Sequence, residues 1–422
     1  MVQKTFFLPL LFGALARMAG AEAGSHSNVV PGSYIVEFED SQDMSLFHTH
    51  TESMDAEVVN RFDYTLFKGA TVQFKNLEAA NERAAEMLSM PMVKQMWPNR
   101  LMKTPNDKVV WASHLSNQTQ LVKKRDTNDT FSTHVMTQVD KLRAEGVTGK
   151  GVKIAIVDSG GVELMAYRVL NCNGTSTEDS IVRGFMRAHD EGADIITASL
   201  GSQRIYDESP GAMGVTVARI VAAGVPCIAA AGNYGEKGLF FAGQPASENK
   251  VVSVASFDNT VTPVLKLWED LSVNRGEPRE FIRLLKAGSN ITLTTAEPEE
   301  LVPILREEPN KDTGGYASAF TSWGPSFEGA IKPQFGAPGG NILSVYPRTK
   351  SSNGAMLGYA VSSGTSMSAP LVAAIYALVR EVRGKLSPGE FESLFSATSR
   401  PQFLKDDLFS PCAHRSPNRV PA

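Results

Sequence analysis

Apolar and polar residues alternate along this chain in blocks that predict strands followed by helices. After residue 150, apolar runs of strand length recur, and amphipathic segments of helix length stand between them. The predicted strands are residues 152–157, 164–170, 194–200, 225–231 and 251–255, and the predicted helices are residues 180–191 and 213–223. Continuous apolar strands separated by helices are typical of a parallel sheet with helices on both faces. The pattern therefore predicts an α/β fold with its site at the carboxyl ends of the strands.

Residues 30–102 predict a smaller α/β module ahead of that fold. Strand-like alternation and helical periodicity succeed each other here too. The predicted strands are residues 33–38, 71–74 and 93–97, and the predicted helices are residues 44–62 and 77–90. Taken alone, this order is also that of an ordinary ferredoxin-like domain.

Composition narrows the class of protein. A chain of 422 residues with 42% hydrophobic content predicts two or three domains with well-packed cores. The net charge of -4 and the pI near 6.0 argue against nucleic acid as a partner. Residues 1–21 predict a secretory signal, because Lys4 precedes an apolar run too short to span a bilayer; a buried N-terminal helix is the alternative. No other segment predicts a membrane span.

The glycosylation triplets also fit a secreted chain, whereas the cysteines exclude a disulfide framework. Asparagines in N-glycosylation triplets predict a glycoprotein; they are Asn117, Asn128, Asn173 and Asn290. The chain has three cysteines, an odd and small number that does not fit a disulfide framework. Cys227, inside an apolar strand, is predicted to be a buried free thiol.

The candidate chemistry lies in three short motifs. Ser366 stands in the run Gly-Thr-Ser-Met-Ser-Ala-Pro and opens a helix of small residues, whose free N–H groups can hold an oxyanion. Asp158 and Asn233 each come directly after an apolar strand. Taken singly, each has a plainer interpretation: a helix N-cap for Ser366, a strand-end turn for Asp158, and a left-handed turn residue for Asn233.

Together these motifs resemble the subtilases, the subtilisin-like serine proteases, and most closely their secreted fungal members. The resemblance implies a serine endopeptidase acting on polypeptides, with Ser366 as nucleophile, Asp158 as orienting acid and Asn233 as oxyanion donor. Substrate backbone would lie along Ser199, Leu200 and Gly201. Residues 30–102 would be an inhibitory propeptide of a zymogen. We expect a monomer without an assigned cofactor or metal; the family allows structural calcium, but no ligand set is readable.

The resemblance does not extend to the histidine that would act as the general base for Ser366. The family's His-Gly-Thr-His stretch, expected between Asp158 and Tyr167, is absent, and none of the seven histidines has a suitable setting. Only residues 158–162 separate the strand ending at Val157 from the next one. Because parallel strands usually need a crossover of about a dozen residues, we expect this short turn to allow only an antiparallel hairpin. We therefore expect a segment carrying the histidine to be missing after Gly160.

The remaining regions complete the predicted organisation. Residues 103–133 predict a linker, in which Lys123–Arg125 is either solvated charge or a processing site. Residues 134–400 predict the catalytic domain, with the remnant of an insertion at about 260–312, and residues 401–422 an irregular tail. Three outcomes stay open: an impaired protease, a non-catalytic peptide-binding pseudoprotease, or a truncated or mis-spliced product of an active protease gene.

Overall fold

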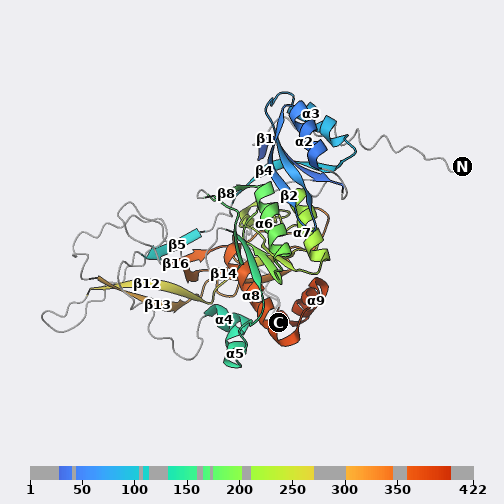
Figure 1. The fold of residues 1–422 in the computed structure, drawn as a ribbon. Coiled ribbons are helices and arrows are strands. Elements are labelled where there is room, and N and C mark those ends of the chain that lie inside the picture. The colour runs from blue at the N-terminus through green and yellow to red at the C-terminus, as the bar shows by residue number, and fades with distance from the viewer. Residues whose placement is uncertain are drawn as a thin grey trace, which may run out of the picture.

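The structure is a computed structural model, in which residues 28–39, 44–103, 108–113, 132–158, 165–171, 174–201, 211–269, 301–345 and 359–400 are described. A small N-terminal α/β module lies at one end of a larger α/β core (Figure 1). Among the helices of the described residues, none has the length and apolarity needed to cross a membrane. The predicted signal, the asparagines of the four glycosylation triplets and the C-terminal tail lie outside the described residues.

A six-stranded parallel sheet forms the centre of the core. Its strand order is β14-β11-β10-β9-β6-β7, and every neighbouring pair is parallel. The strands are β6 (Ile154–Asp158), β7 (Met165–Arg168), β9 (Ile195–Ala198), β10 (Cys227–Ala230), β11 (Val252–Asp258) and β14 (Phe335–Gly340). The predicted α/β class with a parallel sheet is thus confirmed.

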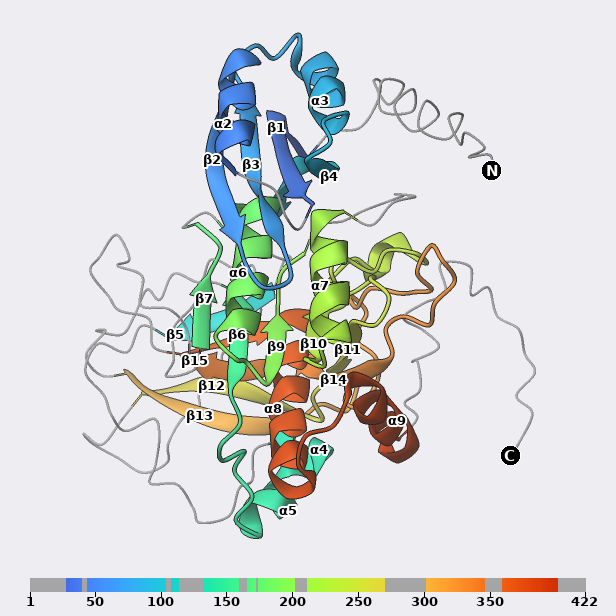
Figure 2. The same ribbon diagram turned by 45° about the vertical axis from the view of Figure 1, so that its right-hand side comes forward.

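Helices cover both faces of this sheet. Because successive strand residues point to opposite sides, neighbouring residues of one strand contact different layers of helices. Cys227 and Ala229 of β10 pack in the cluster that contains α6 (Glu178–Asp190) and α7 (Ala212–Ala222). Ile228 and Ala230 pack instead against α8 (Thr365–Arg383), with α9 (Pro388–Thr398) beside it (Figure 2). Both faces are apolar, as continuous strand runs require.

The expectation of an antiparallel hairpin after Asp158 is wrong. Strands β6 and β7 are parallel, with Ala155 opposite Met165 and Asp158 opposite Arg168. To begin β7 at Met165, opposite Ala155, the chain must come back from Asp158 by the length of three strand residues, about 10 Å. A chain from Asp158 to Met165 can reach roughly 23 Å. The short connection therefore excludes a crossover helix but not parallel pairing, so strand geometry does not demonstrate a missing segment.

The N-terminal module is an antiparallel sheet with two helices on one face. Its strand order is β2-β3-β1-β4-β8, and the last strand belongs to the core. The elements are β1 (Val29–Phe38), α2 (Met44–Ser53), β2 (Ala56–Asp63), β3 (Lys68–Phe74), α3 (Ala80–Leu88), β4 (Val93–Lys103) and β8 (Thr175–Thr177). The predicted helix 44–62 ends early, because Asp55 takes a positive φ of 54° and the alternating residues after it form β2.

Alternation along β1 gives this module two different faces. Val36 and Phe38 pack with α2 and α3 in the core of the module. Ile35, on the opposite face, packs together with Ile181 and Phe185 of α6. The module is therefore joined to the larger core through a continuous apolar contact on α6.

Smaller elements surround the core. They are β5 (Lys108–Ser113), α4 (Ser132–Thr137), α5 (Val139–Ala144), η1 (Gly235–Lys237), β12 (Val261–Glu269), β13 (Leu301–Pro309), β15 (Ile342–Val345) and β16 (Tyr359–Ser363). Strand β5 lies inside the predicted linker and pairs with β16, because its residues 109–111 are β-branched and aromatic. Strands β12 and β13 form an antiparallel ribbon where the insertion remnant is predicted (Figure 1).

Candidate active site

Ser366 is the second residue of helix α8. The helix begins at Thr365 after Gly364, whose N–H donates to the carbonyl of Gly339 at 2.9 Å. Only 8% of Ser366 is exposed. A hydroxyl at this position lies beside the first N–H groups of the helix, where partial positive charge favours an anion.

Helix α8 contains a proline that changes the hydrogen bonding of Ser366. Pro370 lies four residues after Ser366 and has no N–H, so it cannot close the helical bond to the Ser366 carbonyl. The hydroxyl of Ser199 donates to that carbonyl at 2.9 Å instead. The end of β9 is thereby tied to the start of α8.

Asn233 is fixed to the same helix start. Its side-chain oxygen accepts hydrogen bonds from the N–H of Thr365 at 2.9 Å and from the Thr365 hydroxyl at 3.0 Å. A backbone N–H can only donate, so the amide oxygen, and not its nitrogen, faces Thr365. The Nδ2 group of Asn233, which carries the amide hydrogens, is consequently turned away from Thr365.

Asp158 ends strand β6, beside the strand that leads to Ser199. Ile156 pairs with Thr197 across β6 and β9, so Asp158 and Ser199 each follow that pair by two residues. The backbone of Asp158 therefore lies at the carboxyl edge that also carries Ser199 and Asn233. The structure thus brings together the backbones of the predicted site residues at one edge of the sheet.

Ser199, Leu200 and Gly201 have structural contacts of their own. Leu200 is 1% exposed and packs in the α6–α7 cluster, so its side chain points into the core. A Cβ on Gly201 would lie 2.4 Å from the carbonyl oxygen of Gln244, which explains glycine here. Any contact of this segment with a peptide would therefore come from its backbone.

The structure shows an occupied strand edge that the sequence did not reveal. Leu101, Met102 and Lys103 of β4 pair antiparallel with β8, which precedes α6. Met102 is 1% exposed and packs in the same cluster as α6. The only available signal was the weak alternation of Thr175–Thr177, which is too short to predict a strand.

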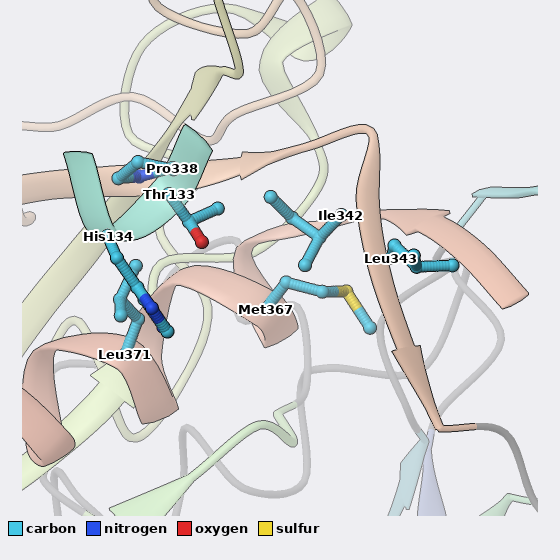
Figure 3. Close-up of a pocket in the computed structure, with 7 residues that line it drawn as sticks. All are labelled: Thr133, His134, Pro338, Ile342, Leu343, Met367 and Leu371. Atoms are coloured by element: carbon cyan, nitrogen blue, oxygen red, sulfur yellow. The ribbon is translucent and has the colours of Figure 1, made fainter. Parts of the chain in front are cut away.

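The described histidines lie in different parts of the fold. His134 of α4 is half-buried and lines a cavity of about 340 Å³ together with Met367 and Leu371. Figure 3 shows Met367 extending toward Ile342 and Leu343, with the His134 ring on the Leu371 side. Ser366 is not among the lining residues, because consecutive helix residues point about 100° apart.

The other histidines of the described part lie farther along the chain or in another module. His189 is near the end of α6, which leads back to the amino end of β9, opposite the edge that carries Ser199. His48 and His50 belong to α2 of the N-terminal module. His26, His114 and His414 lie outside the described residues.

A metal site is not evident in the described part of the chain. None of the residues that the structure describes form a group of three or more His, Cys, Asp or Glu arranged to hold an ion. Cys227 is buried without a disulfide, as predicted, and burial raises the pKa of its thiol well above the ordinary value.

Comparison with known proteins identifies the family. The profile of the subtilase family, peptidase S8, matches residues 160–411, which is more than half of the chain. The chain belongs to the subtilase family.

Individual relatives are distant. The chain is 23% identical over 317 residues to the minor extracellular protease Vpr of Bacillus subtilis, covering 56% of this chain and 39% of that protein. It is 25% identical to the subtilisin-like protease SBT4.10 of Arabidopsis thaliana, covering 71% of this chain and 48% of that protein. The chain therefore spans less than half the length of either relative.

A solved structure supports the fold. Fervidolysin from Fervidobacterium pennivorans, a keratinolytic enzyme related to subtilisin, superposes with a TM-score of 0.55 at 15% identity. The match covers 90% of this chain and 59% of fervidolysin. At this identity the likeness establishes a shared subtilisin-like architecture, and not a shared substrate.

Proposed function

We propose that this chain has the serine endopeptidase site of its family, with Ser366 as nucleophile, Asn233 as oxyanion donor and Asp158 as the residue that would orient a histidine. The observation that carries the proposal is the orientation of Asn233. Two hydrogen bonds from Thr365 hold its amide oxygen, so the orientation of the amide, with its donor end, is fixed at the start of the helix that carries Ser366. Donors fixed before the reaction are the main electrostatic means of stabilising a tetrahedral oxyanion.

We further propose that the chain hydrolyses peptides poorly. The sequence contains no histidine between His134 and His189, and neither position corresponds to the expected base after Asp158. A serine hydroxyl is a weak nucleophile without a base. Loss of the histidine from subtilisin lowers kcat by a factor on the order of 10⁶, and the catalysis that remains comes from substrate binding and the oxyanion hole.

The experiment is a comparison of binding and turnover in the full chain. A peptide boronic acid should bind more tightly than the same peptide amide, and this preference should be lost in Ser366→Ala, while casein hydrolysis stays far below ordinary subtilase rates. His134→Ala should behave like the unmodified chain. Rapid hydrolysis that disappears in His134→Ala would identify that residue as an unrecognised base and refute the proposed impairment.

The N-terminal module supports a second part of the proposal, namely that it is the inhibitory propeptide of the chain. Its contacts with the core are polar as well as apolar. Asp179, 2% exposed at the start of α6, accepts hydrogen bonds from Asn60 at 2.8 Å, Thr71 at 3.0 Å and Asn99 at 3.1 Å. Glu37 forms an ion pair with Arg219 of α7 at 2.8 Å.

The exit of this module supports the same assignment. Leu101–Lys103 lie extended on β8, in the way that a peptide adds a strand to a sheet edge. This contact also favours the alternative function, a pseudoprotease that binds peptides without cleaving them. Retention of amide-peptide binding without any preference for the boronic acid would favour that alternative.

Secretion, with removal of residues 1–21 and processing after Arg125, is proposed on the sequence and on the extracellular character of the Vpr relative.

A further inference from the structure

The turn that carries Asn233 is held from two sides. On one side, the Thr365 hydroxyl accepts the N–H of Gly232 at 3.1 Å, in addition to its bond with Asn233. On the other side lies the loop of residues 317–326, which connects toward β14. The helix start therefore holds the side chain of Asn233 and the backbone N–H before it, and the loop contacts the turn from the opposite side.

Ser322 of that loop makes the two contacts that flank Asn233; farther along, the N–H of Gly235 donates to the carbonyl of Phe320 at 2.8 Å. The N–H of Ser322 donates to the carbonyl of Gly232 at 2.9 Å, and its hydroxyl accepts the N–H of Tyr234 at 3.1 Å. These two bonds bracket Asn233, since they engage the residue before it and the residue after it. Ser322 is 1% exposed, so water cannot easily replace the hydroxyl.

The fit around this hydroxyl is close. Gly232 has a φ of +107°, and a Cβ there would lie 2.8 Å from the Ser322 oxygen. The turn thus reaches Ser322 only because residue 232 is glycine. Loss of the hydroxyl would leave the N–H of Tyr234 without this acceptor and loosen the turn on the side that follows Asn233.

We infer that Ser322 is a positioning residue for Asn233: its hydroxyl and N–H hold the turn so that the Asn233 amide stays aimed at an oxyanion formed on Ser366. This inference rests on the proposed function, because it matters only if Asn233 is an oxyanion donor. Ser322 itself touches neither Ser366 nor the reacting atoms in any contact described above. Its effect is therefore expected in binding of a tetrahedral adduct and not in binding of an unreacted peptide.

The same loop provides matched controls. Ser318 is fully buried, and its hydroxyl bonds to Asp258 and Ser256, away from Asn233. The Thr321 hydroxyl accepts the N–H of Ser256 at 3.0 Å. Ser318→Ala and Ser322→Ala thus each remove one buried hydroxyl from one loop, but only the second removes a contact with the Asn233 turn.

The test measures two dissociation constants for each full-length variant, one for a peptide boronic acid and one for the same peptide as an amide. The boronic acid forms a B–O bond with Ser366, releases the serine proton to solvent and presents a negative tetrahedral centre. Ser322→Ala should weaken the affinity for the boronic acid by about tenfold, which is smaller than the loss expected when an oxyanion donor itself is removed. Affinity for the amide should stay unchanged, and Ser318→Ala should change neither constant. Ser322→Thr, which keeps the hydroxyl, should restore the affinity.

The outcomes separate the two ideas. Unchanged boronic-acid affinity in Ser322→Ala, with a clear preference for boronic acid in the unmodified chain, overturns the role of Ser322 alone. Equal loss of both affinities, or an equal effect of Ser318→Ala, shows a structural role only and also overturns it. If the unmodified chain shows no preference for the boronic acid over the amide, the proposed function is overturned, and the role of Ser322 with it. If Ser322→Ala does not fold, Ser322→Cys, a weaker acceptor of similar size, must show the same selective loss.

Discussion

The hydroxyl of Ser199 donates to the main-chain carbonyl of Ser366 at 2.9 Å, in the place of the helical bond that Pro370 cannot form. Ser199, directly after β9, thus completes the hydrogen bonding of the helix that bears Ser366. The bond couples the carboxyl end of β9 to the start of α8. The bond gives the Ser366 carbonyl a protein donor at a nearly buried position in the first turn.

This relationship predicts a dependence between two substitutions. Ser199→Ala should lower the free energy of unfolding by about 1 kcal/mol, the typical value of one buried hydrogen bond. In a Pro370→Ala background, residue 370 regains its N–H and can bond the Ser366 carbonyl, so the loss from Ser199→Ala should shrink. Urea unfolding of the four chains of this double-mutant cycle measures the coupling. Strictly additive effects would show that the Ser199 bond does not substitute for the helical one.

A second prediction concerns Thr365, which is fully buried and contacts the Asn233 turn twice through its hydroxyl. Thr365→Val keeps the shape and the backbone N–H but removes the hydroxyl. The N–H of Gly232 then loses its acceptor, so stability should fall by about 1–3 kcal/mol. Affinity for a peptide boronic acid should fall as well, measured by titration, whereas Thr365→Ser should retain most of both properties. A valine variant with unchanged boronic-acid affinity would contradict this view of the turn.

A third prediction concerns the attachment of the N-terminal module. Asp179→Ala removes the acceptor that Asn60, Thr71 and Asn99 share at a buried contact; of these donors, Asn99 keeps a bond to the Ser33 hydroxyl at 3.2 Å. The module should detach more readily, with a loss of about 3 kcal/mol or more. Hydrogen exchange of β4 in the full chain measures this opening.

Asp190 provides the matched control. It also lies on α6 and accepts a module N–H, that of Thr65 at 3.0 Å, but its side chain is 26% exposed. Water can therefore replace that bond, and Asp190→Ala should change the exchange of β4 far less. Equal protection of β4 in both variants would show that Asp179 does not hold the module.

A fourth prediction concerns pH. Lys332 is 6% exposed, and its ammonium donates to the carbonyls of Glu248 at 2.7 Å and Val251 at 2.6 Å. Burial lowers the pKa of Lys332 to about 8 from 10.5, opposed by the nearby carboxylates. Between these values the unfolded chain binds more protons at this residue than the folded chain, so its contribution to stability rises with pH.

The comparison with Lys332→Met isolates this contribution. From pH about 8 upward, the stability of the unmodified chain relative to the variant should increase, by at most about 1.4 kcal/mol per pH unit. Urea unfolding at several pH values in that range measures the difference. A difference that is flat or falls as the pH rises would mean that the ammonium is not destabilised by burial.

The sequence predicted the architecture of the core better than its details. Apolar strands such as the one ending at Asp158 can be recognised from sequence, because a strand that is buried on both faces has few polar positions. The positions of Ser366 and Asn233 followed from the strands and helix that carry them. Hydrogen bonds such as those of Ser322 could not be predicted, because residues far apart in sequence meet only in the folded chain. The parallel pairing of β6 with β7 differs from the expectation, because the usual length of a crossover connection is not a geometric limit.

The final prediction concerns the gene. We propose that a longer, active form exists, with an additional segment between Gly160 and Glu163. The motif around Asp158 and the strand β7 beyond are both intact, and gradual decay of an enzyme would more readily replace a histidine than remove the whole stretch expected around it. The ribbon β12–β13 marks a second place where the sequence suggests an incomplete insertion. Sequencing genomic DNA and transcripts across the codons for Gly160 and Glu163 measures this directly. An in-frame segment encoding a His-Gly-Thr-His-like motif, present in transcripts, is the expected result. Contiguous coding DNA would refute the longer form and leave a chain whose site lacks its base by deletion.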